Sequence, residues 1–431
     1  MVVNINTNSY NNSGTGGDGI KTKSTDDDEG YVTINGGTVT INAGSSGAGD
    51  GIQAKQNFYM NGGTVDIYTY AGYTYTGSGS TSSSGNQGGM GNQGGMNDSG
   101  NTNSTENSCK GIKAVGRYVD EDADDPTYSD QGNTWIYAGD ITINSSDDCI
   151  HTGGNVYLYG GTYDLCSADD AIHSDNDLYI GQTAANTYSD PYIEIGYSYE
   201  GIEGFDIIVN CGSVLVYATD DGFNAAGGSD STGISGGGGF DQGNMGSGGS
   251  DGSQCLTING GYVCVVQNGS GNEPLDYGDS NACYYNGGTV IAVGNGESMG
   301  EMSSNALFDA SSGLSITAGS TITFTDSSGN VLATLNTPYN VTMMTFCCDS
   351  VSSATCYTGA TLSGVTYFAG LTNCTYNSGY RFGYGGTASG GTTIESQGNV
   401  DGGTSGDQGP NGGGDSSSGP GGNSGNQGGG F

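Results

Sequence analysis

Basic residues are scarce in this sequence. The 431 residues include 7 Lys and Arg against 45 Asp and Glu, which gives a formal net charge of -38. A surface with this charge repels phosphate backbones, so nucleic acid is not expected as a partner. Metal cations are the natural counter-charge for so many carboxylates.

Apolar residues are also few. Only 33% of the chain is hydrophobic, which is too little for a wide globular core. No apolar segment approaches the ~20 residues of a membrane span, and the first ten residues lack the basic and apolar regions of a signal peptide. If the protein is secreted, this numbering starts after a removed signal or within a longer chain.

Several motifs are missing. The 11 Cys include no CxxC pair, which excludes a zinc ribbon. Neither an EF-hand nor a GxSxG, HExxH or P-loop pattern occurs, so we assign no catalytic residue. Cys347, Cys348, Cys356 and Cys374 cluster near the C-terminus and are candidates for disulfides.

A four-residue pattern recurs seven times: an acid, a small residue, a large apolar residue and a polar residue. The copies, which we call tetrads, read DGIK, DGIQ, KGIK, DCIH, DAIH, EGIE and DGFN, and begin at Asp18, Asp50, Lys110, Asp148, Asp170, Glu200 and Asp221. The closest copies begin 22 and 21 residues apart. This spacing indicates one small structural unit that is stacked repeatedly.

A second block follows many tetrads and consists of two alternating strands around a Gly-Gly corner. VTINGGTVTI, which ends at Ile41, and FYMNGGTVDI, which ends at Ile67, are examples. One unit is therefore three short strands, about the perimeter of one coil of a parallel β-helix. A leucine-rich-repeat horseshoe has a similar period but needs Leu ladders and helices that are not present.

The predicted fold class is all-β, a parallel β-helix (solenoid) with a small antiparallel β C-terminal cap. We place the β-helix at residues 1–310, with Gly-rich inserts at 77–108 and 227–254. The Gly-Gly period stops in the next segment, 311–380, which we interpret as the cap. Residues 381–431 form a Gly/Ser/Asn-rich tail.

Strand alternation assigns a direction to each column of the tetrads. The third residue is expected to face inward, and the second and fourth outward. The small second column then forms a low outer strip, although tight turns with positive φ would also require small residues. The fourth column forms a polar wall that suits an anionic polysaccharide. The ligand-binding candidates are Lys21, Gln53, Lys113, His151, His173, Glu203 and Asn224, together with Lys110.

Paired acids beside this strip predict Ca²⁺ as the cofactor. Equivalent carboxylates on adjacent coils repel one another, and carboxylate and carbonyl oxygens are ligands that calcium prefers. Acids that only cap turns are the alternative interpretation. The candidate metal ligands are Asp147, Asp148, Asp169, Asp170, Asp175, Asp177, Glu200, Asp220 and Asp221.

Three runs carry a resemblance to a known family: DDAIHSDNDLYI from Asp169, SYEGIEG from Ser198 and ATDDGFNAAGG from Ala218. The chain resembles bacterial, extracellular, calcium-binding carbohydrate-binding domain-containing proteins, which are right-handed β-helices related in fold to pectate lyases. The matching acids are Asp148, Asp170, Glu200 and Asp221. Lys110 and Cys149 depart from the pattern.

The resemblance implies a secreted or cell-surface protein that binds an acidic polysaccharide such as polygalacturonate, and also cellulose, without catalysis. The first alternative is a structural subunit of an extracellular fibre or matrix, which would form homo-oligomers or filaments. The second is a polysaccharide lyase, for which the candidate bases would be His151, His173, Lys113 and Arg117.

Overall fold

The computed structural model describes most of the repeats and the cap of this chain. The described residues are 1–7, 17–22, 30–43, 49–74, 109–116, 132–182, 188–225, 255–269, 272–277, 282–295, 306–310, 313–368, 370, 374 and 381–396. The predicted inserts at 77–108 and 227–254 lie outside these residues, as does the tail from residue 397 onward. The described residues include no helix long and apolar enough to span a membrane.

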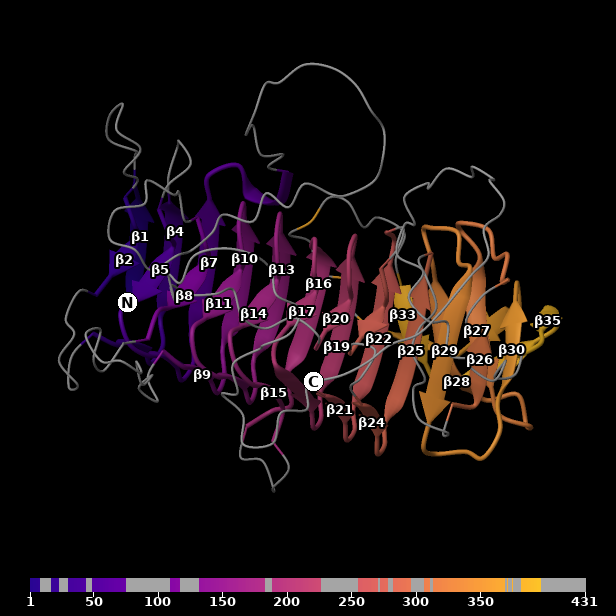
Figure 1. Cartoon of the computed structure of the whole chain (residues 1–431). Helices are drawn as coiled ribbons and strands as arrows, with labels where there is room; N and C mark the ends of the chain where they lie inside the picture. The colour runs from indigo at the N-terminus through magenta and orange to yellow at the C-terminus, as the bar shows by residue number, and fades with distance from the viewer. Residues whose placement is uncertain are drawn as a thin grey trace, which may run out of the picture. The chain divides into compact units, whose positions relative to one another are not determined.

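Three parallel sheets form the body of the fold, and each coil contributes one strand to each sheet (Figure 1). Sheet A contains, in spatial order, β1 (Val2–Asn6), β4 (Thr38–Ala43), β7 (Thr64–Thr69), β10 (Asp140–Ser145), β13 (Thr162–Ser167), β16 (Tyr192–Tyr197), β19 (Ser213–Ala218), β22 (Tyr262–Gln267) and β25 (Thr289–Gly294), followed by the antiparallel β29 (Met343–Cys348) and then β26 (Phe308–Ala310).

The other two sheets have shorter strands. Sheet B contains β2 (Ile20–Lys21), β5 (Ile52–Ala54), β8 (Ile112–Ala114), β11 (Ile150–Thr152), β14 (Ile172–Ser174), β17 (Ile202–Glu203), β20 (Phe223–Asn224) and β23 (Leu275–Asp276). Sheet C contains β3 (Val32–Ile34), β6 (Phe58–Met60), β9 (Thr134–Ile136), β12 (Val156–Leu158), β15 (Leu178–Ile180), β18 (Asp206–Val209), β21 (Cys255–Ile258) and β24 (Ala282–Tyr285). The predicted parallel β-helix is confirmed.

The C-terminal strands are antiparallel, as predicted for the cap. One sheet contains β32 (Thr366–Tyr367), β33 (Arg381–Tyr384), β28 (Val331–Asn336), β27 (Thr321–Thr325), β30 (Thr355–Thr358) and β35 (Thr392–Ile394), and a second pairs β31 (Thr361–Ser363) with β34 (Thr387–Ser389). The antiparallel sheets thus extend past residue 380, because short alternating runs lie within the Gly-rich sequence there. The 3-10 helix η1 (Gly72–Thr74) is the one helical element among the described residues.

The alternating apolar residues of the coils fill the interior, as the sequence predicts. Val39 and Ile41 of β4 are buried above Val65 and Ile67 of β7, and the apolar third residues of the tetrads pair from coil to coil. A second apolar cluster lies on the outer face of sheet A, where Tyr217 and other outward residues of β19, β22 and β25 pack with cap residues. The cap therefore covers a side of the solenoid.

The cysteines pair differently from the expectation. Cys166 of β13 forms a disulfide with Cys374, whereas Cys347, Cys348 and Cys356 are buried free thiols. Cys347 and Cys348 lie in β29 and Cys356 lies in β30, and these strands belong to different sheets.

The second column of the tetrads faces inward, which corrects the predicted outer strip. Cys149 and Ala171 are buried in the apolar core, and a Cβ on Gly111 would lie 2.5 Å from Cγ2 of Ile143. These residues occupy the corner before each sheet B strand, where strand alternation does not apply. Gly111 does not have a positive φ, so turn conformation does not require the small residue. Close packing requires it, against Ile143 of sheet A and against the backbone oxygen of Cys149 in the next coil, which is also 2.5 Å from the added Cβ.

Gly111→Ala should therefore destabilise the fold by about 1–3 kcal/mol, because the added methyl group overpacks the corner. Gly370→Ala is the control, since a Cβ there meets nothing within 4 Å. Denaturant unfolding of both variants checks the expectation. Equal stability of the two would contradict the close-packing explanation.

Candidate functional site

The tetrads stack in register along sheet B and place equivalent residues side by side. The fourth-column neighbours include His151 beside Lys113, His151 beside His173, and His173 beside Glu203. An eighth tetrad, Glu273–Asp276, continues the stack through β23 and was missed in the sequence. Pro274 at its second position hid it, although the acid, apolar and polar positions were readable.

The first-column acids have a structural role between coils. Oδ1 of Asp18, Asp50, Asp148 and Asp221 each accepts the backbone N–H of the first residue in the next tetrad, over 2.6 to 3.3 Å. Lys110 lacks such an oxygen, and the N–H of Asp148 is instead bonded by Oδ1 of Asp147 at 3.0 Å. Acids in this column thus satisfy corner amides whether or not they bind a cation.

Lys110 forms a buried ion-pair centre with Asp147 and Asp148. Its Nζ lies 2.9 Å from Oδ1 of Asp147 and 2.6 Å from Oδ2 of Asp148, and all three side chains are 3% exposed. Burial favours the neutral amine, but the two carboxylates raise the pKa of Lys110 well above its usual range. Burial would likewise raise the pKa of Asp148, yet Lys110 and His151 hold it well below its ordinary value.

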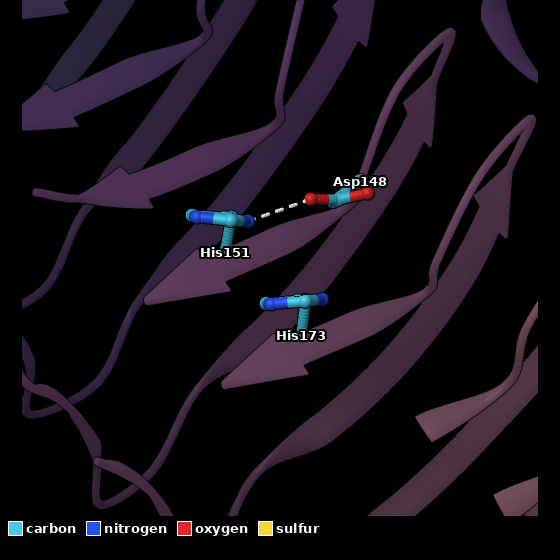
Figure 2. Close-up of side chains that lie close together, drawn as sticks. All are labelled: Asp148, His151 and His173. Atoms are coloured by element: carbon cyan, nitrogen blue, oxygen red, sulfur yellow. Dashed lines mark hydrogen bonds and ion pairs between the residues drawn. The ribbon is translucent and has the colours of Figure 1, made fainter. Parts of the chain in front are cut away.

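Two imidazoles stack next to this centre. The rings of His151 (β11) and His173 (β14) are 4.7 Å apart and inclined by 10°, and Figure 2 shows both projecting from the same face of adjacent strands. His151 Nδ1 lies 2.8 Å from Oδ2 of Asp148. Both histidines are 1% exposed, so they are enclosed by the protein.

His173 is surrounded by carboxylates. Its Nδ1 lies 2.9 Å from Oδ2 of Asp170 and 2.8 Å from Oε2 of Glu203, and its Nε2 lies 3.1 Å from Oδ1 of Asp175. Burial favours neutral imidazole, but these hydrogen bonds raise the pKa of His173 well above its usual range. Burial and the charges of Glu203, Glu200 and Asp169 raise the pKa of Asp170, although His173 opposes the shift.

A third cluster consists of carboxylates. Glu200, Asp220 and Asp221 are partly buried and bring three oxygens within 4.8 Å of one another. Burial raises the pKa of Asp221 to about 7, and neighbouring acids contribute to the shift. Burial and the charge of Glu203 raise the pKa of Glu200, while its hydrogen bond from Asn224 Nδ2 opposes this. Repulsion among these three carboxylates is thus larger than repulsion between Asp147 and Asp148, whose charges Lys110 offsets.

The remaining predicted residues are dispersed. Lys21 is 39% exposed in its side chain and pairs with Asp18 at 2.8 Å; Gln53 is partly buried; and Lys113 is buried. Asp169 joins Asp147 and Asp148 in a further group of nearby ligand atoms. Asp177 accepts a hydrogen bond from Tyr179 and belongs to none of the metal-compatible groups among the described residues.

The predicted polar wall is therefore largely interior. The fourth-column residues Lys113, His151, His173 and Asn224 are at most 9% exposed, and the first-column candidate Lys110 is buried as well. Alternation correctly directs the fourth column away from the apolar stack, but it cannot reveal what covers that side of the strand.

A row of aromatic rings on sheet C also escaped the sequence analysis. Tyr59, Trp135, Tyr157 and Tyr179 stack with centroids 4.9 to 5.4 Å apart and interplanar angles of 3° to 7°. The readable signal was an aromatic residue at the middle of four three-residue strands of this sheet, β6, β9, β12 and β15. Because neighbouring rings cover one another's faces, a sugar would meet mainly ring edges and hydroxyl groups along this row.

Lys110→Met should destabilise the protein by about 3–5 kcal/mol, since it leaves two buried carboxylates without their cation. Lys21→Met removes an exposed partner and should change the free energy of unfolding by at most about 1 kcal/mol. Denaturant unfolding at pH 7 measures both. Similar losses for the two variants would contradict the burial argument.

The pH dependence of stability should report on Asp221. Its pKa is about 7 in the fold against an ordinary 3.8, so the folded state binds the proton more tightly. Its contribution to stability is therefore full below about pH 4 and lost as pH rises through about 7. In calcium-free solution, the melting temperature of the wild type should fall over this window more steeply than that of Asp221→Asn. Parallel profiles would contradict the assignment.

Of the comparisons with known proteins, one gives a match, and that match is to a family model. The search of curated proteins and the search of solved structures each found no significant match. A family model described as "Carbohydrate-binding domain-containing protein" matches residues 2–171 and 122–252. These matches together cover more than half of the chain and most of the tetrads. The chain belongs to this family of carbohydrate-binding domain-containing proteins.

Proposed function

We propose that this protein is an extracellular, calcium-dependent binder of acidic polysaccharides such as polygalacturonate, and that it acts without catalysis. Family membership supports polysaccharide binding. The observation that carries calcium dependence is the net charge of -38. A polysaccharide with its own carboxylates would be repelled by this surface unless a cation lay between them.

The cluster of Glu200, Asp220 and Asp221 is the best candidate for the calcium ligands. Its donors are all oxygens, as calcium prefers, and the three residues are partly buried, so solvent reaches them. The raised pKa of Asp221 reflects burial among like charges, a cost that a cation would remove. A bound calcium ion would supply the positive charge that a glycan carboxylate requires.

The acids near Lys110 are less suitable for calcium. Asp147 and Asp148 already accept hydrogen bonds from the ammonium group at 2.9 and 2.6 Å. A calcium ion there would have to displace a buried cation that both carboxylates stabilise. We therefore narrow the proposed calcium ligands to the carboxylate cluster and assign Asp147 and Asp148 to the fold.

The accessible end of the fourth column is the proposed contact for the glycan chain. Lys21 is exposed and Gln53, its neighbour in register, is partly buried. An ammonium and an amide group at adjacent positions can bind carboxylate and hydroxyl groups of an extended sugar chain. Secretion is part of the same proposal, and the Cys166–Cys374 disulfide supports it because such bonds persist in oxidising compartments.

Calcium should raise the melting temperature of the wild type and allow its retention on immobilised polygalacturonate. A ligand that binds only the folded state stabilises it by about 2.7 kcal/mol at 100 times its Kd. The double variant Asp220→Asn/Asp221→Asn should lose both effects. The double variant Asp66→Asn/Asp140→Asn, which changes exposed acids of β7 and β10, is the charge-matched control and should keep them.

Two outcomes would overturn parts of the proposal. Equal melting temperatures in calcium and in excess chelator would exclude the calcium site. Absence of retention on polygalacturonate and on cellulose, with calcium present, would exclude the proposed ligand class. Release of unsaturated sugar products would instead favour the lyase, and regular filaments in glycan-free electron micrographs would favour the structural subunit.

A further inference from the structure

Nδ1 of His173 has more hydrogen-bond acceptors near it than it can donate to. Nδ1 has two carboxylate oxygens within hydrogen-bonding distance, from Asp170 at 2.9 Å and from Glu203 at 2.8 Å. An imidazole nitrogen carries at most one hydrogen, so these two anions compete for a single donor. At a side chain that is 1% exposed, two carboxylates this close are costly unless a proton or a metal ion lies between them.

The same three atoms have the spacing of a metal ligand set. Ligands about 2.0–2.2 Å from a tetrahedral zinc ion lie about 3.3–3.6 Å from one another. Asp170, His173 and Glu203 offer three ligand atoms within 4.8 Å of one another, with the two nitrogen–oxygen distances just below 3 Å. Small side-chain shifts would open the group to admit an ion. We propose that His173 Nδ1, Asp170 and Glu203 bind a divalent transition metal ion of the zinc type.

Asp175 completes this geometry from the other side of the ring. Its Oδ1 lies 3.1 Å from Nε2 of His173. Histidines that bind metals commonly donate their second ring N–H to a carboxylate, which fixes the ring and makes the ligand nitrogen more basic. Asp175 is thus a positioning residue for His173, and the imidazole remains oriented with Nδ1 toward Asp170 and Glu203.

The donor set separates this site from the proposed calcium cluster. An imidazole nitrogen suits zinc and related metals, whereas calcium selects oxygen ligands. The proposed zinc ligands are different residues from the Glu200, Asp220 and Asp221 cluster, and the inference does not require glycan binding.

His151 is an internal comparison at the same tetrad position. Its Nδ1 contacts one carboxylate, Asp148, whose Oδ2 also lies 2.6 Å from Nζ of Lys110. On the coil after His151, the fourth-column residue is His173. On the coil after His173, the same position holds the carboxylate of Glu203. Asp148, His151 and His173 also bring ligand atoms together, but a metal there would have to displace the Lys110 ammonium group. We therefore expect one transition-metal site, at His173.

Zinc titration of the full-length protein tests the proposal. The chain is stripped with chelator, returned to calcium-containing buffer, and titrated with Zn²⁺ by calorimetry, with bound metal counted after desalting. The wild type should bind one zinc per chain, and His173→Gln and Asp170→Asn should show no saturable binding. Asp175→Asn should weaken affinity by about 10–100-fold. His151→Gln is the matched control and should bind as the wild type does.

Cobalt substitution supplies a second readout. Co²⁺ in the wild type should give visible absorption bands of a low-coordinate nitrogen and oxygen site, and these should be lost in His173→Gln but retained in His151→Gln. Melting curves of each variant establish that it is folded. Absence of stoichiometric zinc in the wild type, or equal binding by folded His173→Gln, would overturn the site. Either result leaves the calcium and glycan measurements unaffected.

Discussion

The in-register stacking of coils is the constraint on which the rest of this structure depends. Because each residue lies about 4.8 Å from its equivalent in the next coil, any charge in the repeat is placed beside a like charge. The chain resolves this repulsion differently along sheet B. Lys110 neutralises Asp147 and Asp148, His173 lies among three carboxylates, and Glu200, Asp220 and Asp221 retain mutual repulsion. The charge arrangement of the side chains therefore changes from coil to coil, while the backbone of sheet B repeats.

The sequence predicts the fold well because the period of the tetrads and the alternation of apolar residues within strands both indicate a parallel β-helix. The recurrence of the tetrads predicted which strands become neighbours, and alternation placed residues such as Val39 and Ile41 in the interior. The second column could not be predicted in this way. It lies at corners, where direction depends on how sheet A and sheet B approach each other, and only a three-dimensional contact such as that of Gly111 with Ile143 reveals it.

The candidate site was partly predictable for similar reasons. The sequence identified the acid column and the two histidines, because they repeat at one position. It could not show that Lys110 is buried between acids 37 and 38 residues later in the chain. Nor could it show that Asp170 and Glu203 converge on one nitrogen of His173. Such contacts join residues on different coils, so they depend on side-chain rotamers, which the aligned repeat sequences do not specify.

The pairing of β25 with β29 has a consequence for polymerisation. The strand that follows β29 in sheet A is β26, which has three residues where β25 has six. A short edge behind a reversed strand is a poor template for addition of another chain. Head-to-tail growth that repeats the coil register is thus disfavoured at this edge of sheet A.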